Sequence, residues 1–244
     1  MLLFSTDIDG TVYDGEQSAR LFAGFWAELK SERGGYLAYN TGRALDDTLG
    51  LIASTPLPEP DFIISGVGTS IYDVRGERLV QGFHDHLNEG WDPELAHRVV
   101  EQSVSDGLSR QPDECQSQHK RSWFWHGASA SGLSALEQAL VGAGLATQVV
   151  YSSARDLDVI PARANKANAL LFLMRYLNSA VARTLVAGDS GNDAAMLALG
   201  EVDSIVVSNA EAALMERLQG HECFVASQPC ASGVIEGLKH YLSS

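Results

Sequence analysis

The sequence from Leu2 to Thr11 is LLFSTDIDGT, a short apolar run that ends in two aspartates two positions apart. The run is typical of a buried strand, and Asp7 and Asp9 follow its carboxyl end. A simple turn would also explain these residues, because Asp-Gly is among the commonest turn dipeptides. The stretch alone leaves both interpretations open, so the rest of the chain has to decide between them.

Helix-like and strand-like segments alternate on both sides of this stretch, which predicts βαβ units and a parallel sheet of the α/β class. In the first half, apolar residues at helical spacing end at Gly34-Gly35. They are followed by a strand at 36–41, a helix at 45–52 and a strand at 61–67. In the last third we expect helices at 166–177, 194–199, 211–218 and 233–242, and strands at 184–189, 204–209 and 223–227.

Between these parts the pattern changes to that of a small α+β insert. We expect a hairpin at 70–82, helices at 93–107 and 131–142, and strands at 121–127, 147–153 and 156–160, the last two close enough to pair antiparallel. The predicted organisation is a Rossmann-like α/β core of residues 1–80 and 161–244, split by a cap domain of residues 81–160.

Composition narrows the class of partner. The 244 residues carry 17 Lys and Arg against 31 Asp and Glu, a formal net charge of −14. Nucleic acids and anionic membranes are bound through an excess of Lys and Arg, so we expect neither as a partner. The N-terminus has no basic segment typical of a signal peptide, and no run approaches the roughly 18 apolar residues of a membrane span. The three cysteines show no C-x-x-C spacing, so a cytoplasmic protein without a disulfide framework is expected.

Polar residues of a consistent kind follow four predicted strands or precede a predicted helix. They are Asp7 and Asp9, the run Asn40-Thr41-Gly42-Arg43, the pair Asn165-Lys166, and GDSGND with Asp189, Asn192 and Asp193. Ligands of open α/β sheets bind outside the carboxyl ends of the strands, so these groups are expected to meet. Several carboxylates in one place repel each other without a cation, and hard oxygen ligands suit Mg²⁺.

The segments DIDGT, TGR, a distant Lys and GDSGND, in this order, resemble the four motifs of the haloacid dehalogenase superfamily of phosphohydrolases. The insert lies between the second and third motifs, as in the subclass with a large α/β cap. Within that subclass the chain is similar to the group of sucrose-phosphatases and mannosylfructose-phosphate phosphatases, through YLAYNTGR, GVGTSIY, YSSARDLDVIPARANKANA and LVAGDSGND.

The resemblance implies a Mg²⁺-dependent hydrolysis of a sugar phosphate. Asp7 is then the nucleophile that forms an aspartyl phosphate, and Asp9 protonates the leaving sugar oxygen and later activates water. Lys166 neutralises the transferring group and pairs with the nucleophile. The phosphate-binding set is Gly10, Thr41, Gly42, Lys166 and Asn192, and the metal set is Asp7, Asp9 through its carbonyl, Asp189 and Asp193.

The expected substrate is a disaccharide phosphate, either sucrose 6-phosphate or mannosylfructose phosphate. Sucrose-phosphatases often carry Asn where this chain has Gly10, which leaves the chemistry intact and the choice of sugar open. Polar residues expected to contact the sugar are Arg43, Gly68 and Thr69 from the core, and Gln118, Lys120, Arg155, Asp156 and Asp158 from the cap. A glycosyltransferase (synthase) of the same pathway is the expected protein partner.

Other interpretations compete with these. Trp123 and Trp125 share one strand face, which favours the core of the cap over stacking on a sugar. His84 and His86 lack the spacing of a helical metal pair and are expected in a surface hairpin. A sugar phosphomutase remains the alternative enzyme, since relatives with this cap type transfer phosphate between hydroxyls. A non-catalytic sugar-phosphate sensor is disfavoured because no motif residue is missing.

Overall fold

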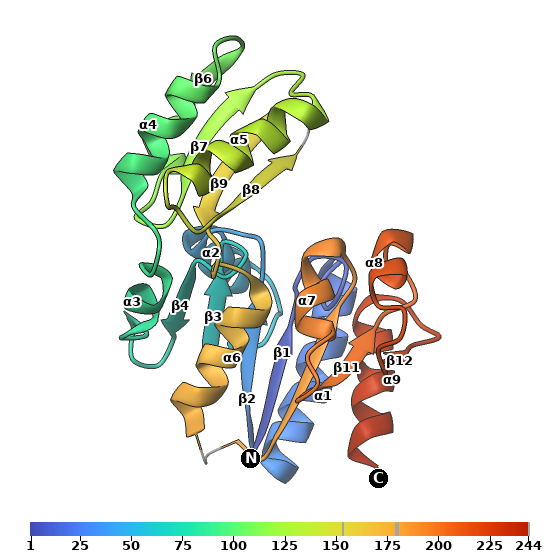
Figure 1. The fold of residues 1–244 in the computed structure, drawn as a ribbon. Coiled ribbons are helices and arrows are strands. Elements are labelled where there is room, and N and C mark those ends of the chain that lie inside the picture. Colours follow the sequence, from blue (N-terminus) through green and yellow to red (C-terminus); the bar gives the residue numbers. More distant parts are fainter. Residues whose placement is uncertain (153, 179–180, 244) are drawn as a thin grey trace. The chain divides into compact units, whose positions relative to one another are not determined.

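The computed structural model describes residues 1–152, 154–178 and 181–243. The chain divides into two compact units, which we call the core (Met1–Val80 and Asn165–Ser244) and the cap (Gln81–Ala164). Figure 1 shows that the chain enters the cap once and returns once, so both parts of the core contribute strands to one sheet. Each unit is described by itself below.

The core is built on an eight-stranded sheet of order β12-β11-β10-β1-β2-β3-β4-β5. Strands β12 to β3 in this order pair in parallel, and β4 and β5 add an antiparallel hairpin. The predicted α/β class with a parallel sheet is therefore confirmed. The strands are β1 (Leu2–Thr6), β2 (Gly35–Asn40), β3 (Phe62–Ser65), β4 (Ser70–Asp73), β5 (Arg78–Leu79), β10 (Arg183–Gly188), β11 (Asp203–Val206) and β12 (Phe224–Val225).

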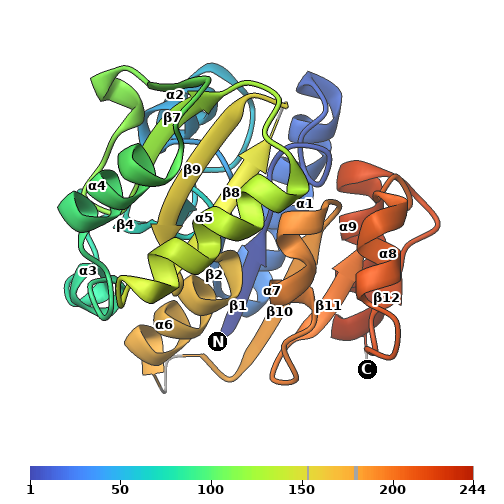
Figure 2. The same cartoon turned by 45° about the horizontal axis from the view of Figure 1, so that its top comes forward.

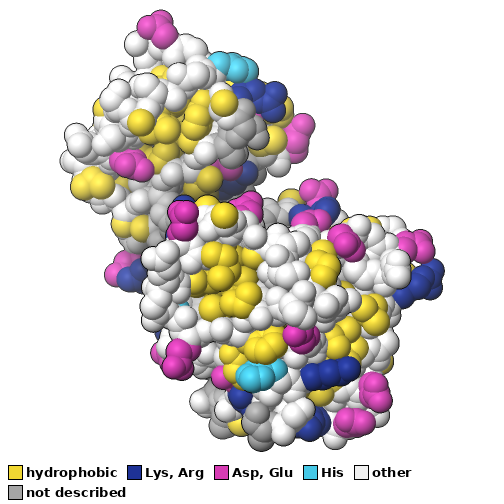
Figure 3. Space-filling view, turned by 90° about the vertical axis from the view of Figure 1, so that its right-hand side faces the viewer, with side chains coloured by type: hydrophobic (Ala, Val, Ile, Leu, Met, Phe, Trp, Pro, Cys, Tyr) yellow, Lys and Arg dark blue, Asp and Glu magenta, His cyan; other side chains and the backbone are white. Residues whose placement is uncertain are grey.

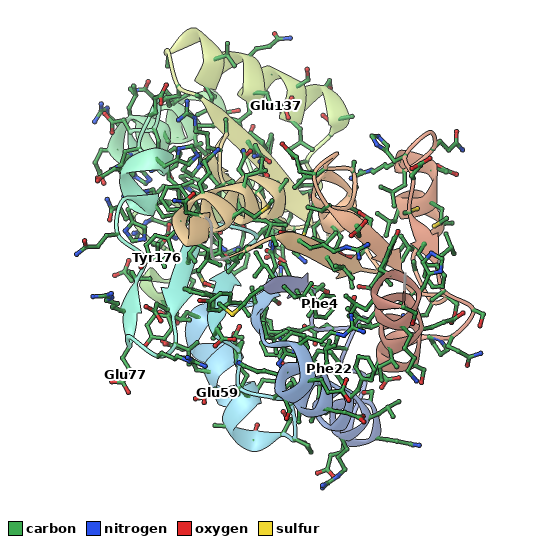
Figure 4. The ribbon with its side chains drawn as sticks, turned by 90° about the horizontal axis from the view of Figure 1, so that it is seen from below. Phe4, Phe22, Glu59, Glu77, Glu137 and Tyr176 are labelled. Atoms are coloured by element: carbon green, nitrogen blue, oxygen red, sulfur yellow. The ribbon has the colours of Figure 1, made fainter. Side chains whose placement is uncertain are left out.

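Helices cover both faces of this sheet. They are α1 (Glu16–Arg33), α2 (Leu45–Ser54), α6 (Lys166–Leu177), α7 (Ala194–Leu197), α8 (Ala212–Arg217) and α9 (Cys230–Leu242), with a 3₁₀ turn η3 (Gly191–Asp193) before α7. Alternation along β1 explains the two layers: Phe4 packs against Phe22 and Trp26 of α1, whereas Ser5 contacts Met196 of α7. Figure 4 shows Phe4 and Phe22 together between β1 and α1.

The cap has a four-stranded antiparallel sheet of order β6-β7-β9-β8 and two helices that contact each other, α4 (Pro93–Ser103) and α5 (Ala130–Gly142) (Figure 2). Its strands are β6 (Leu108–Arg110), β7 (Arg121–Trp125), β8 (Thr147–Ser152) and β9 (Asp156–Pro161). The expected antiparallel pairing of the last two strands is confirmed; Ser153, which the prediction included, lies outside the described residues.

One face of the cap sheet packs against the helices. Trp123 and Leu157 are fully buried there, and Trp125 packs against the same hydrophobic cluster, so the interpretation of both tryptophans as cap core is confirmed. The chain stays with the cap beyond β9, because Gln148 Nε2 donates to the carbonyl oxygens of Ala162 and Ala164.

Three local predictions were wrong. His84 and His86 lie in a short helix, α3 (Phe83–Leu87), and not in a hairpin, because Phe83 and Leu87 are both buried one helical turn apart. The helix expected to reach residue 107 ends at Ser103, and the chain turns at Gly107 (φ 75°) into strand β6. Helix α9 begins at Cys230, three residues earlier than expected.

The face of the molecule that Figure 3 shows carries its charge in a dispersed form. Figure 3 shows acidic and basic side chains scattered singly or in small groups over one face of the molecule. None of the described helices combines the length and the apolar character needed to cross a lipid bilayer. Among the described residues, Asp7, Asp189 and Asp193 form a group of carboxylates that could hold a metal ion, at the edge of the core sheet described below.

The start of β3 depends on one buried carboxylate, and this gives a first prediction. Asp61 accepts hydrogen bonds from Lys30 Nζ (2.8 Å) and the Leu37 amide (3.0 Å), and it pairs with Arg75 (3.0 Å). Asp61→Ala leaves the Leu37 amide without this acceptor, so we expect a loss of about 1–3 kcal/mol of stability. The measurement is the unfolding midpoint in urea.

Glu59 serves as the matched control, since it is an exposed acidic residue two positions earlier (labelled in Figure 4). Glu59→Ala should leave the midpoint nearly unchanged. Equal midpoints for Asp61→Ala and the wild type would show that these hydrogen bonds do not stabilise the core.

Candidate active site

Parallel pairing brings the ends of three strands to one edge of the core sheet. Thr6, the last residue of β1, lies opposite Tyr39 of β2 and Ala187 of β10. The residues that follow these strands therefore share that edge, which is the upper end of the core sheet in Figure 1. The Asp7 amide extends the pairing by donating to the Ala187 carbonyl oxygen at 3.0 Å.

Lys166 is the centre of the site. Its Nζ donates to Asp7 Oδ1 and to Asp193 Oδ1, each at 2.7 Å, and its side chain has no exposed surface. The three residues come from the end of β1, the start of α6 and the turn η3. A buried ammonium that contacts two carboxylates is held in one orientation and stays charged.

Burial and charge shift the pKa values of this group. Burial raises the pKa of Asp7 to about 7; Lys166 opposes this, and the nearby charges of Asp193 and Asp189 add to it. For Lys166, burial would lower the pKa, but the carboxylates of Asp193 and Asp7 raise it above its ordinary value. Burial also raises the pKa of Asp189. The cluster therefore has more negative charge than its one ammonium balances, which is the condition that favours binding of a cation.

The three carboxylates could hold a metal ion. Asp7, Asp189 and Asp193 can each present an oxygen so that all three lie within 4.8 Å of one another. Asp193 accepts the most hydrogen bonds of the three. Its Oδ1 accepts from Lys166, and its Oδ2 accepts from the amides of Asp189 (3.1 Å) and Ser190 (3.0 Å). The donor set is hard oxygen, the kind of ligand that Mg²⁺ prefers, and Asp7 and Asp189 have fewer hydrogen bonds at their carboxylates than Asp193.

Gly10 is required by the position of Asp189. Its φ of 74° is left-handed, and a Cβ at this position would lie 2.4 Å from Asp189 Oδ2. Thr11 Oγ1 donates to the other oxygen, Oδ1, at 2.8 Å. The loop after β1 thus fixes the carboxylate that follows β10, a contact between residues 178 positions apart in the chain.

The cluster opens into a cavity of about 420 Å³ in the core. Its lining consists of Asp7, Asp9, Thr41, Gly42, Arg43, Asp189, Ser190 and Asn192. Six of these eight residues belong to the predicted catalytic, phosphate-binding and metal sets. Asp9 lies on the exposed side of the cavity, where Arg43 pairs with its carboxylate. The volume and the polar lining suit a phosphoryl group together with part of the molecule that carries it.

Gly68 and Thr69, predicted to contact the sugar, have other neighbours within the core. A Cβ on Gly68 (φ 89°) would lie 2.3 Å from the carbonyl oxygen of Asn165, so the loop packs directly on the start of α6. Thr69 Oγ1 donates to the Ser65 carbonyl oxygen at 3.4 Å. Gly68 therefore packs against the backbone of Asn165, the residue just before Lys166.

Asn40 is a site residue whose contact the sequence analysis missed. It is fully buried at the end of β2, and its Nδ2 donates to the backbone carbonyl oxygen of Lys166 at 3.0 Å. The partners are 126 positions apart. The only signal in the sequence was that Asn40 is a polar residue between an apolar strand and Thr41. This position does not indicate that Asn40 contacts Lys166.

The predicted sugar-binding residues of the cap form local pairs. Lys120 Nζ lies 3.1 Å from Asp158, which also accepts from Ser122 Oγ at 2.6 Å. Arg155 donates to Asp156 and lies 5.0 Å over the ring of Phe124. Asp156 and Asp158 share one face of β9, because the alternating Leu157 and Val159 are buried against the helices.

Gln118 is the remaining cap candidate. Its backbone carbonyl oxygen accepts from Trp91 Nε1 at 2.8 Å, so the contact that fixes this position involves the main chain. Gln118, Lys120, Arg155 and Asp158 all belong to the cap, and Asp7, Lys166 and Asp189 all belong to the core.

Comparison with known proteins identifies relatives along the whole chain. Residues 1–242 match the family described as sucrose-6F-phosphate phosphohydrolase. The chain is 38% identical over 240 residues to the mannosylfructose-phosphate phosphatase of Agrobacterium fabrum, covering 98% of this chain and 96% of that protein. It is 29% identical to sucrose-phosphatase 1 of Nicotiana tabacum and spans 59% of that longer protein.

A solved structure agrees with these matches. The sucrose-phosphatase of Synechocystis sp., determined in complex with sucrose and phosphate, superposes with a TM-score of 0.81 at 30% identity, covering 98% of this chain and 97% of that one. A haloacid dehalogenase-like hydrolase of Bacillus subtilis shares the fold with a TM-score of 0.70 at 20% identity.

The contact between Gly68 and Asn165 gives the second prediction. Gly68→Ala places a methyl group against the backbone just before Lys166, in a conformation that disfavours Ala. We expect a lower thermal midpoint and a kcat reduced about 10- to 100-fold on every phosphate ester, because Lys166 moves with the backbone. Thermal denaturation and steady-state kinetics measure the two effects.

Gly24 in α1 provides the control, since a Cβ there meets nothing within 4 Å. Gly24→Ala should keep full activity and raise the midpoint slightly. If Gly68→Ala behaved in the same way, the packing of this loop on α6 would not position Lys166.

Proposed function

Because the chain belongs to the sucrose-6F-phosphate phosphohydrolase family of the haloacid dehalogenase superfamily, we propose that it hydrolyses the phosphate monoester of a disaccharide through a phosphoryl group on Asp7. It is a phosphoric monoester hydrolase of the sucrose-phosphatase-like group. The observation that carries the mechanism is the buried contact of Lys166 with Asp7, beside a cavity lined by the other motif residues.

In the first step, Asp7 attacks phosphorus and the bond from phosphorus to the sugar oxygen breaks. Lys166 donates to Asp7 Oδ1 and so holds the carboxylate that makes the attack in a fixed orientation. Asp9 gives its proton to the departing sugar oxygen. Lys166 stabilises the negative charge of the transferring group, and the Thr41 hydroxyl, the Gly42 amide, Asn192 and the backbone at Gly10 hold its oxygens.

In the second step, water attacks the phosphorus atom of the aspartyl phosphate. Asp9, now a carboxylate, takes a proton from that water, and the bond from phosphorus to Asp7 breaks. Orthophosphate leaves, and both the Asp7 carboxylate and the Asp9 proton are restored. No oxidation or reduction occurs in either step.

Mg²⁺ would be held by Asp7, Asp189 and the backbone carbonyl of Asp9, and when bound it supplies positive charge to the phosphoryl oxygens. Asp193 supports this site through its hydrogen bonds to the Asp189 amide and to Lys166. Thr11 and Gly10 fix the Asp189 carboxylate from the other side. The residues of this chain thus set the ligand positions before an ion arrives.

The proposed substrates are mannosylfructose phosphate and sucrose 6-phosphate. A relative with 38% identity is a mannosylfructose-phosphate phosphatase, and a solved relative with 30% identity holds sucrose and phosphate. We propose that Asp158 and Lys120 of the cap hydrogen-bond sugar hydroxyls, with Gln118 and Arg155 near them. We also propose, on the family resemblance, that a glycosyltransferase supplies the phosphorylated disaccharide.

A direct test of the reaction measures phosphate release from mannosylfructose phosphate, sucrose 6-phosphate and a set of monosaccharide phosphates. We expect turnover of a disaccharide phosphate that disappears in excess chelator and returns with Mg²⁺. Asp7→Asn removes the attacking oxygen and should abolish turnover in the presence of Mg²⁺.

Asp46→Asn, at an exposed position of α2, controls for the loss of one negative charge and should remain active. Hydrolysis by Asp7→Asn near the wild-type rate would contradict the assignment of the nucleophile. Full activity in chelator would contradict the metal site.

If the core catalyses the reaction and the cap selects the sugar, mutations in the two units should have different effects on different substrates. Lys166→Ala should lower kcat for a disaccharide phosphate and for 4-nitrophenyl phosphate alike. Asp158→Ala should lower kcat/KM for the disaccharide phosphate by roughly 5- to 150-fold, the effect of losing one hydrogen bond of about 1–3 kcal/mol, and should spare the small ester.

The comparison requires both substrates with each variant. Glu137, which is exposed on α5 and labelled in Figure 4, provides the control in the cap as Glu137→Ala. Equal losses on both substrates in Asp158→Ala would show that Asp158 stabilises the cap and does not read the sugar.

A further inference from the structure

Arg43 and Asp9 form a two-point ion pair on the open side of the active-site cavity. Arg43 Nε donates to Asp9 Oδ2 at 2.6 Å, and Nη2 donates to Oδ1 at 2.7 Å. Both carboxylate oxygens of Asp9 are therefore oriented by one planar guanidinium, and such a two-point contact fixes direction as well as distance. The Asp9 side chain is 50% exposed, whereas that of Asp7 is 9% exposed.

The backbone of Arg43 is fixed as well. Its amide donates to Thr41 Oγ1 at 3.1 Å, and its carbonyl oxygen accepts from the Gly66 amide at 2.8 Å. The guanidinium thus projects from an anchored loop, directly after the residues proposed to bind phosphate. Its hydrogen bond to Asp9 raises the pKa of Arg43, so the group is a permanent cation that neither gives nor takes a proton.

This arrangement suits only one of the two tasks of Asp9. Both Asp9 oxygens accept hydrogen bonds from the guanidinium, so in this geometry the side chain acts only as an acceptor, the role needed to receive a proton from water. Donation of a proton to the leaving sugar oxygen needs a different geometry, in which one Asp9 oxygen no longer contacts Arg43. The observed pair therefore has the geometry that the second step requires.

We propose that Arg43 is the positioning residue for Asp9, which orients the carboxylate for the hydrolysis of the aspartyl phosphate. This inference rests on the proposed function. In the step concerned, the water oxygen bonds to phosphorus, the bond from phosphorus to Asp7 breaks, and Asp9 receives the water proton.

The test separates the two steps with 4-nitrophenyl phosphate, whose leaving group departs without a proton. Rapid mixing follows nitrophenolate for the first step, and acid quenching counts the phosphate bound to protein. In Arg43→Met we expect a burst of about one nitrophenolate per active site, followed by a steady state that is 10- to 100-fold slower than wild type. Arg43→Lys, which keeps the charge but not the two-point geometry, should lie between them.

Arg20→Met is the control, because Arg20 is an exposed arginine of α1 in a pair with Glu16, and it should match the wild type. A merely structural role of Arg43 would lower the thermal midpoint without producing a burst. Slowing of the burst and of the steady state by the same factor in Arg43→Met would overturn the proposal, as would unchanged kinetics.

Failure of the proposed function gives a different result. If the wild type released phosphate but no variant ever carried phosphate on protein, and Asp7→Asn stayed active, the aspartyl phosphate itself would be excluded. The proposed role of Arg43 in hydrolysing the aspartyl phosphate would then be excluded as well. A phosphoenzyme that forms in the wild type and does not accumulate in Arg43→Met contradicts the role of Arg43 alone.

Discussion

The contact of one buried ammonium with two carboxylates is the interaction on which the rest of the site depends. Lys166 Nζ lies 2.7 Å from both Asp7 and Asp193, and none of its side chain is exposed. Two carboxylates this close would repel each other without the ammonium, and an isolated ammonium at this depth would lose its hydration without compensation. Each of the three charges therefore requires the other two.

This constraint explains why segments far apart in the chain have to be positioned accurately relative to one another within the core. Asp7 and Lys166 are 159 positions apart, and the whole cap lies between them in the sequence. Parallel pairing of β1 with β10 fixes the distance from Asp7 to the Asp189 loop. The start of α6 is fixed independently, by the side chain of Asn40 and by the close approach of Gly68. Small residues and a buried amide thus support the ion pairs.

The sequence predicted the core better than the cap, for a physical reason. Buried parallel strands are continuous apolar runs that end in polar residues, so their order and their ends are visible. Helix α3 has five residues, three of them polar, and its two buried anchors are too few to show a period. The motif residues were predictable as a set, but their hydrogen-bond partners were not. The pairing of Arg43 with Asp9 and of Asn40 with Lys166 depends on the three-dimensional arrangement of segments that are distant in sequence.

The spacing of the two aspartates follows from the residue between them. Ile8 is fully buried in the core cluster, and its carbonyl oxygen accepts from the amides of Thr11, Val12 and Tyr13. This anchor turns the chain, so that Asp7 is buried against Lys166 while Asp9 reaches the open side of the cavity and Arg43. Two chemically identical side chains thereby acquire different surroundings, the arrangement that lets one carboxylate attack while the other moves protons. A spacing of two positions is the shortest that leaves room for such an anchor.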